Sequence, residues 1–179
     1  TEKIASNAYI LRFPFGPKRY LRKELLWPYL DDLADQLVTN LQLKDRLPDW
    51  IHAHYADAGY VGSLISSRLG IPLVFTGHSL GREKQRRLLA AGVDHDQIEH
   101  TYSISRRIDA EELALAHANL VITSTRQEAE HQYARYGNYA KHKAEVVPPG
   151  VDAVRFHPIS SNDEIKIVEE LLAPFLRQP

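Results

Sequence analysis

The sequence contains no cysteine and no methionine among its 179 residues. The absence of cysteine excludes a disulfide framework and any metal site made of thiolates, and it is compatible with a reducing cytoplasm, where we expect the protein to be located. No apolar run approaches the roughly 20 residues that a membrane-spanning helix needs. A formal net charge of −1 gives no general reason to expect binding to nucleic acid or to an acidic membrane.

The composition that remains is that of an ordinary globular domain, with 44% hydrophobic and 25% charged residues. A chain of this length can bury a substantial core, and one domain is the first expectation. Because the sequence starts at Thr1 and lacks an initiating methionine, we expect it to be a piece of a longer polypeptide.

Apolar runs typical of strands alternate along the chain with segments of helical periodicity. The expected strands are residues 8–13, 50–53, 72–76, 120–123 and 145–147, and the expected helices are residues 21–43, 58–69, 82–91, 96–118, 126–136 and 162–176. This alternation predicts an α/β fold, in which a Rossmann-like parallel sheet has helices on both faces and right-handed crossovers.

Short polar or tightly turning residues follow four of the expected strands. These pairs are His54-Tyr55, His78-Ser79, Ser124-Thr125 and Pro149-Gly150. Because the carboxyl ends of parallel strands meet at one edge of the sheet, the pattern predicts a single cleft along that edge.

The segment TGHSLGREK, which follows the expected strand 72–76, is the richest in chemistry. Gly77 and Gly81 permit close approach of the backbone to a ligand, Ser79 can donate a hydrogen bond, and Arg82 and Lys84 can meet an anion. Lys84 lies at the start of an expected helix, whose N-terminus adds its own attraction for anions. The segment therefore predicts a phosphorylated, polyhydroxylated ligand.

Histidines precede and follow this strand. His52 and His54 have the spacing of half a zinc site and lie on one face of a strand, but no third ligand is obvious nearby, so no metal is expected. Either one of the two packs while the other faces the cleft with Tyr55, or both bond to backbone groups. His78 can act as a general base, a donor to substrate or a strand-end cap. A substrate-contacting role is favoured over a nucleophilic Ser79, which lacks a Gly-x-Ser-x-Gly elbow.

Two further features leave alternatives open. Adjacent residues on a helix point about 100° apart, so at most one of Arg106 and Arg107 can point directly into a given site. A pair between Arg107 and Glu111, four residues apart, is the structural alternative. Asp57 is expected to cap a helix that starts near Ala58 rather than to act as an acid.

Several segments, read in order, bear a resemblance to a known family. They are PFGP, RKELLWPYL, IHAHYADAG, TGHSLGREK, SRRIDAEELAL, VITSTRQE and VVPPGVD. In order and spacing they are similar to sucrose-phosphate synthase, one of the retaining glycosyltransferases built from two Rossmann-like lobes, the GT-B fold. The likeness runs from Ala8 to about His157, and several motifs in order are far more specific than any one of them alone.

The resemblance implies that residues 1–160 are a partial amino-terminal, acceptor-binding lobe and that residues 161–179 form a helix leading to a second lobe. The family also needs a first strand with a Gly-Gly-Gln loop and a second lobe that grips the nucleotide-sugar. Neither is in this sequence, so the missing second lobe of the same polypeptide is an expected partner. The piece by itself is not expected to catalyse transfer.

The family moves glucose from UDP-glucose to the 2-hydroxyl of fructose 6-phosphate and forms sucrose 6-phosphate, with retention at the anomeric carbon. The resemblance therefore implies a nucleotide-sugar donor and a sugar-phosphate acceptor, with no cofactor and no metal. Matched residue by residue, it makes His78 the catalytic candidate, beside the transferred glucose. It makes Lys23 and Tyr55 contacts of the acceptor sugar.

The same matching assigns the acceptor phosphate to Ser79, Lys84 and the pair Arg106 and Arg107, without deciding which arginine makes the direct bond. Sucrose synthase, whose acceptor is free fructose, is the nearest rival, but it lacks the serine and the arginine pair. A two-lobed UDP-sugar epimerase and a pure binding module are rivals of other classes. Assays with fructose, with fructose 6-phosphate and with UDP-glucose alone distinguish them.

Overall fold

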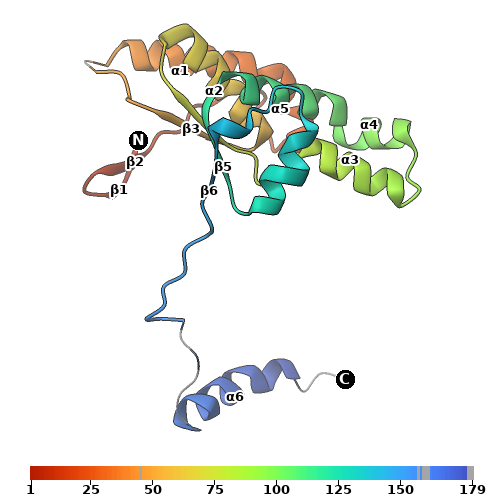
Figure 1. Ribbon diagram of the computed structural model, residues 1–179. Coiled ribbons are helices and arrows are strands. Elements are labelled where there is room, and N and C mark those ends of the chain that lie inside the picture. The colour runs from red at the N-terminus through yellow and green to blue at the C-terminus, as the bar shows by residue number, and fades with distance from the viewer. Residues whose placement is uncertain (45, 157, 159–161, 177–179) are drawn as a thin grey trace. The chain divides into compact units, whose positions relative to one another are not determined.

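The computed structural model describes residues 1–44, 46–156, 158 and 162–176. These residues form two compact units, Thr1–Pro148 and Pro149–Pro179. The first unit holds the sheet and most of the helices (Figure 1). The second contains helix α6, Asn162–Leu176, which has the bounds expected from the sequence. The domain boundary expected at residue 160 lies outside the described residues.

The centre of the first unit is a four-stranded parallel sheet. Its strands, in their spatial order, are β3 (Ile51–His54), β4 (Leu73–Thr76), β5 (Ala118–Thr123) and β6 (Ala144–Val146). Every neighbouring pair is parallel, and the order follows the sequence. The expected α/β fold with a parallel sheet is therefore confirmed.

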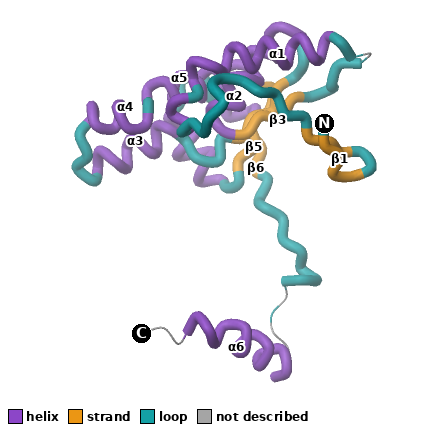
Figure 2. The backbone as a smooth tube through the Cα atoms, turned by 180° about the vertical axis from the view of Figure 1, so that it is seen from behind, coloured by secondary structure: helices purple, strands orange, loops and turns teal. Residues whose placement is uncertain are grey.

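The described residues of this unit form five α-helices. They are α1 (Leu30–Gln42), α2 (Tyr55–Leu69), α3 (Gly81–Ala90), α4 (His95–Tyr102) and α5 (Ile104–His117). Helices α1, α2 and α5 lie together beside the sheet, and α3 and α4 lie side by side at one end (Figures 1 and 2). None of the described helices is both long and apolar enough to cross a membrane.

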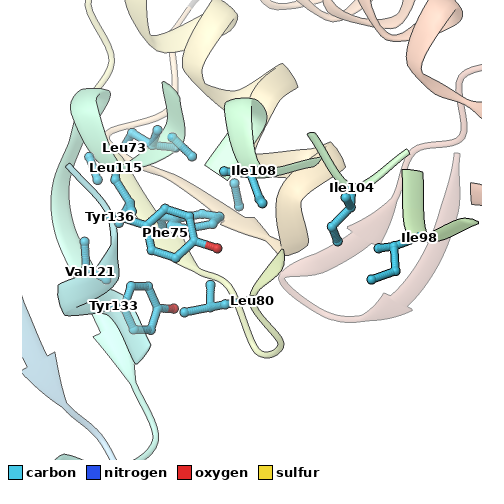
Figure 3. Close-up of a cluster of buried hydrophobic side chains, with 13 residues drawn as sticks. Leu73, Phe75, Leu80, Ile98, Ile104, Ile108, Leu115, Val121, Tyr133 and Tyr136 are labelled. Atoms are coloured by element: carbon cyan, nitrogen blue, oxygen red, sulfur yellow. The ribbon is translucent and has the colours of Figure 1, made fainter. Parts of the chain in front are cut away.

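Side chains of β3 and β4 alternate between the two faces of the sheet. A Cβ added at Gly62 of α2 would lie 3.1 Å from both Ala53 and Leu73, so these side chains face α2. The main core lies on this face and contains Phe75, Leu115, Val121 and Tyr133 among others (Figure 3). His52 and His54 alternate with Ala53 and therefore project from the opposite face.

Four expected elements differ in kind or in number from the observed ones. Residues 8–13 contribute only β2 (Ala8–Ile10), which pairs antiparallel with β1 (Glu2–Ala5) in a hairpin apart from the main sheet, because the two residues between them form a tight turn. The long helix expected at 96–118 is two helices, α4 and α5. They part at Ser103, whose φ of 44° is left-handed and cannot continue a right-handed helix.

The other two differences concern the type of helix that forms. Residues 21–29 form two 3₁₀ turns, Lys23–Leu25 and Trp27–Tyr29, before α1 begins at Leu30. Pro28 occupies the first turn of the second of these, where its missing N–H costs nothing. The expected helix 126–136 is largely a π-helix at Glu128–Gln132 followed by a 3₁₀ turn.

Candidate functional site

A pocket of about 330 Å³ opens at the carboxyl end of β3. It is lined by Lys23, Glu24, Trp27, Tyr55, Ala56, Asp57, Lys84, Tyr102 and Arg107. We call it the basic pocket, because three of its side chains are cations. Four of the seven residues singled out from the sequence line it, and they come from the turns before α1 and from α2, α3 and α5.

The N-terminus of α2 forms one wall of the basic pocket. The helix begins at Tyr55, directly after β3, and Tyr55, Ala56 and Asp57 make up its first turn. No side chain caps this end in the described part of the chain. Its free backbone N–H groups and the positive end of the helix dipole are therefore available to an anion.

Asp57 is not the cap that the sequence predicted. The helix starts three residues earlier than expected, so His54 occupies the N-cap position and Asp57 lies inside the first turn, facing the pocket. Tyr55 has a φ of 69°, in the left-handed region that a bulky residue rarely adopts. This sharp backbone turn lets β3 pass into α2 without a loop.

The cations of the basic pocket are close enough to repel one another. Burial lowers the pKa of Lys84, and the charges of Arg107 and then Lys23 lower it further, while Glu24 opposes them. The ammonium of Lys84 lies 3.4 Å from the centre of the Tyr102 ring. Among the described residues, neither lysine forms a salt bridge. An anion in this pocket would relieve the repulsion.

Arg107 is buried and joins α5 to the turn after β4. Its Nε donates to Glu111 at 3.0 Å, so the expected pair four residues apart does form. Its Nη2 donates to the Oγ of Ser79 at 2.9 Å and also to the Ser79 carbonyl. The guanidinium thus lines the pocket and fixes Ser79 beside it.

Arg106 points elsewhere. It is exposed and lines a separate pocket of about 320 Å³ with Trp27, Tyr60 and Asp109. The structure therefore separates the two neighbouring arginines, and only Arg107 reaches the basic pocket. Trp27 lies between the two pockets and lines both.

The N-terminus of α3, where an anion site was expected, is already occupied by the protein. The backbone N–H of Gly81 donates to both carboxylate oxygens of Glu111, at 2.8 and 3.1 Å. The next N–H, of Arg82, donates to the hydroxyl of Tyr136 at 3.0 Å. Lys84 therefore contributes its own charge to the basic pocket. The prediction that this helix N-terminus adds an attraction for the anion is wrong.

The two glycines of the turn and Arg82 also have structural roles. A Cβ at Gly77 would lie 2.6 Å from Leu80 and 2.9 Å from the Tyr133 hydroxyl, and one at Gly81 would lie 2.9 Å from Glu111. The backbone approaches these side chains rather than a ligand. Arg82 forms a salt bridge with Glu112 at 2.7 Å, so its charge is neutralised within the protein and does not face a ligand.

His78 and its neighbours form an aromatic cluster at the same strand ends. The Nδ1 of His54 lies 2.8 Å from the Nε2 of His78, and the ring centroids of Tyr55 and His78 are 4.6 Å apart. His52 lies next to His54 but binds the hydroxyl of Thr76, at 2.9 Å. Burial lowers the pKa of His52, and His54 and then His78 lower it further.

Neither of the two alternatives left open for the histidines is matched in full. Both His52 and His54 are exposed, and both bond to side chains, His52 to Thr76 and His54 to His78. Among the described residues, no group of three or more His, Cys, Asp or Glu side chains could hold a metal ion.

The basic pocket uses only the first two of the four strand ends that were expected to share a cleft. Ser124 and Thr125 instead begin the next helical segment: the Ser124 N–H donates to the Glu128 carboxylate at 2.8 Å, and the Glu128 N–H donates to Thr125 at 3.1 Å. Pro149 and Gly150 belong to the second unit.

Sequence reasoning missed Glu24, Trp27 and Tyr102 as lining residues. Glu24 and Trp27 lie in the RKELLWPYL segment, in which only the basic residues were considered as ligand contacts. Tyr102 precedes Ser103, and the left-handed backbone at Ser103 ends α4 beside the pocket. No local pattern marks such a break.

Comparison with known proteins gives consistent results. The family model described as the first GT-B domain of sucrose synthase matches residues 1–163. A sucrose-phosphate synthase from Spinacia oleracea is 46% identical over 155 residues, which cover 78% of this chain and 15% of that protein. A probable sucrose-phosphate synthase 1 from Citrus unshiu is 46% identical over 149 residues, covering 75% of this chain and 14% of that protein.

A solved structure of a sucrose-phosphate synthase from Thermosynechococcus elongatus superposes with a TM-score of 0.60 at 22% identity, covering 80% of this chain and 33% of that chain. At this identity the likeness shows the fold. The chain spans about 15% of the length of the curated relatives it matches.

Proposed function

The chain belongs to the family of the first GT-B domain of sucrose synthase, and from that membership we propose that it is the acceptor-binding part of a retaining glucosyltransferase. The whole enzyme would transfer glucose from UDP-glucose to fructose 6-phosphate and form sucrose 6-phosphate. Relatives that carry the name sucrose-phosphate synthase support this choice. A second lobe of the same polypeptide would hold the nucleotide-sugar, and a cytoplasmic location is part of the proposal.

The observation that carries this proposal is the charge of the basic pocket. Lys23, Lys84 and Arg107 come from three separate elements and face one cavity, together with the uncapped N-terminus of α2. A phosphate dianion suits such a cluster, because each charged hydrogen bond contributes about 1.5–3 kcal/mol. Burial, and after it the charges of Arg107 and Lys23, lower the pKa of Lys84, and a bound phosphate would favour the charged form of this lysine.

The rest of the pocket suits the sugar part of the ligand. Glu24 and Asp57 offer carboxylate oxygens to sugar hydroxyls, and Trp27 and Tyr102 offer apolar surface. The volume, about 330 Å³, lies at the lower end of the range for small-molecule pockets, which fits a single sugar ring with its phosphate.

In the proposed reaction, the bond between the anomeric carbon of glucose and the UDP oxygen breaks. A bond to the 2-hydroxyl oxygen of fructose 6-phosphate forms on the same face, and the proton of that hydroxyl passes to the departing UDP oxygen. Holding the acceptor by its phosphate fixes where that hydroxyl lies, and such positioning is a large part of the catalysis of group transfer. His78, whose ring contacts that of the pocket residue Tyr55, would contact the transferred glucose.

A product assay on the full-length protein tests the proposal. With UDP-glucose, we expect sucrose 6-phosphate from fructose 6-phosphate and little product from fructose. In Lys84→Ala, the rate with fructose 6-phosphate should fall at least tenfold through loss of one charged hydrogen bond, while the rate with fructose stays the same. Lys141→Ala is the matched control, because Lys141 is exposed and pairs with Glu130.

Other outcomes would identify the rival functions. Equal rates with the two acceptors would favour a sucrose synthase and contradict the proposal. A new nucleotide-sugar formed from UDP-glucose without any acceptor would indicate an epimerase. Binding of fructose 6-phosphate without transfer by the full-length protein would leave a binding module.

A further inference from the structure

The imidazole rings of His54 and His78 are joined by a hydrogen bond. Their nitrogens Nδ1 and Nε2 are 2.8 Å apart, and the rings are stacked with centroids 5.1 Å apart. Such a bond needs one N–H and one lone pair, so it fixes the tautomer of both imidazoles together. The two rings come from neighbouring strand ends, since His54 is paired in register with Thr76, two residues before His78.

The backbone of His78 is held independently of this bond. The preceding N–H, of Gly77, donates to Tyr133 at 2.8 Å, and the following carbonyl, of Ser79, accepts from Arg107. His78 itself has a φ of 56°, a left-handed conformation that costs energy and persists only when its surroundings enforce it. The backbone therefore fixes the position of the Cα of His78, but not the rotamer of its side chain.

Among the described residues, the side chain of His78 makes one hydrogen bond, to His54, and its remaining ring contact is with Tyr55. The Nδ1 of His78 thus has no protein partner in that part of the chain. It is the ring atom that remains available to a ligand.

We propose that His54 is a positioning residue for His78. Both rings carry the Nε2–H tautomer, which is the one a free neutral imidazole prefers. The Nε2–H of His78 donates to the Nδ1 of His54, and the Nδ1 of His78 is left as an acceptor for a sugar hydroxyl. His54 does not touch the ligand. Its part in transfer rests on the proposed function, whereas its effect on the tautomer of His78 does not.

The tautomer is measured directly on this chain by long-range ¹H–¹⁵N spectra of ¹⁵N-histidine-labelled protein at a pH where the rings are neutral. In the unaltered chain, we expect His78 to show a protonated Nε2 and an unprotonated Nδ1. In His54→Ala the acceptor is gone, and His78 should show averaged nitrogens of a mixed tautomer. In His54→Asn, whose Oδ1 can take the place of Nδ1, the single tautomer should return.

His52→Gln is the matched control. The altered ring lies on the same strand and face, and the glutamine amide can still reach Thr76, so the signals of His78 should not change. An unchanged His78 tautomer in His54→Ala would overturn the proposal, as would a protonated Nδ1 in the unaltered chain. Because His54 is exposed, His54→Ala should stay folded, and a thermal unfolding curve checks this.

Steady-state kinetics of the full-length protein test the consequence for transfer. His54→Ala should lower kcat about tenfold through misplacement of His78, with KM for fructose 6-phosphate changed less than twofold. His54→Asn should recover most of kcat. Unchanged kcat, or a rise in KM alone, would overturn the positioning role in transfer. If the unaltered full-length protein makes no sucrose 6-phosphate, the proposed function fails, and the tautomer spectra still decide the relation of His54 to His78.

Discussion

Glu111 accepts two hydrogen bonds from the backbone N–H of Gly81, so a buried carboxylate of α5 closes the N-terminus of α3. The same carboxylate pairs with Arg107, which reaches on to Ser79. One side chain therefore anchors the turn after β4, the helix that carries Lys84 and the arginine that lines the basic pocket. The positions of these pocket residues depend on how closely α3 approaches α5.

Gly81→Ala should destabilise the protein, because the added methyl group would lie 2.9 Å from both Glu111 and Ile108. Neither neighbour can move freely, since both belong to the packed side of α5. We expect a loss of about 1–3 kcal/mol in the free energy of unfolding, measured by urea denaturation. Gly137→Ala is the control: its methyl group would meet nothing closer than 3.9 Å, and a change within about 0.5 kcal/mol is expected.

Arg106 and Arg107 should differ in their effect on anion binding. Arg107→Gln should weaken binding of fructose 6-phosphate to this chain at least tenfold, because a charged group is lost from the basic pocket. Arg106→Gln should change it less than twofold, since Arg106 lines another pocket. Calorimetric titration measures both. Similar losses in the two variants would contradict the placement, and unfolding curves would show whether Arg107→Gln remains folded.

Tyr133 and Tyr139 provide a second matched pair. The Tyr133 hydroxyl accepts the buried N–H of Gly77 at 2.8 Å, whereas the Tyr139 hydroxyl is buried without a hydrogen-bond partner among the described residues. Tyr133→Phe should therefore cost about 1–3 kcal/mol, the penalty of an unsatisfied buried N–H. Tyr139→Phe should leave the free energy of unfolding unchanged or raise it. Equal costs would show that the hydrogen bond to Gly77 contributes nothing.

Acid should weaken the fold partly through Glu83. Hydrogen bonds from Arg86 and then Arg87 lower the pKa of Glu83 from 4.5 to about 2. Because the folded state holds the carboxylate ionised to lower pH than the unfolded state does, this stability is complete above pH 4.5 and is lost as the pH falls toward 2. In Glu83→Gln, the free energy of unfolding should vary less with pH in that window.

The control for this experiment is Glu130→Gln. The ion pair of Glu130 with Lys141 is long, at 3.5 Å, and exposed, so it should contribute little. Its pH profile should follow that of the unaltered protein. Identical profiles for all three proteins would show that the contacts of Glu83 with its arginines are broken in solution.

Local signals in the sequence were sufficient for the parallel sheet and for most helix positions. Apolar runs bounded by glycine and proline located β3 to β6, and the alternation of strand and helix predicted that the strands are parallel, whereas their spatial order is seen only in the structure. The same signals failed at Ser103 and at Asp57. There the helix limits depend on backbone turns with positive φ, at Ser103 and Tyr55, that no residue type announces.

The candidate site was predictable to a similar degree. The residues near the strand ends, His78, Tyr55 and Lys84, follow from the position of the strands, and the resemblance added Lys23 and the arginine pair. The glycines of the turn and Arg82 were misread, because their partners Glu111, Glu112, Tyr133 and Tyr136 all lie 30 or more residues away and cannot be seen in a local pattern.

The amino-acid sequence alone determined that cations and histidines would follow the strands of a parallel sheet, because periodicity and chain direction are local properties. Only the tertiary structure decided which charges remain free for a ligand. Among the residues that the structure describes, it left Lys23 and Lys84 without a salt bridge, turned Arg107 inward and Arg106 away, and filled the N-terminus of α3 while leaving that of α2 open. Charge pairing depends on distances between helices, which are set by how the core packs.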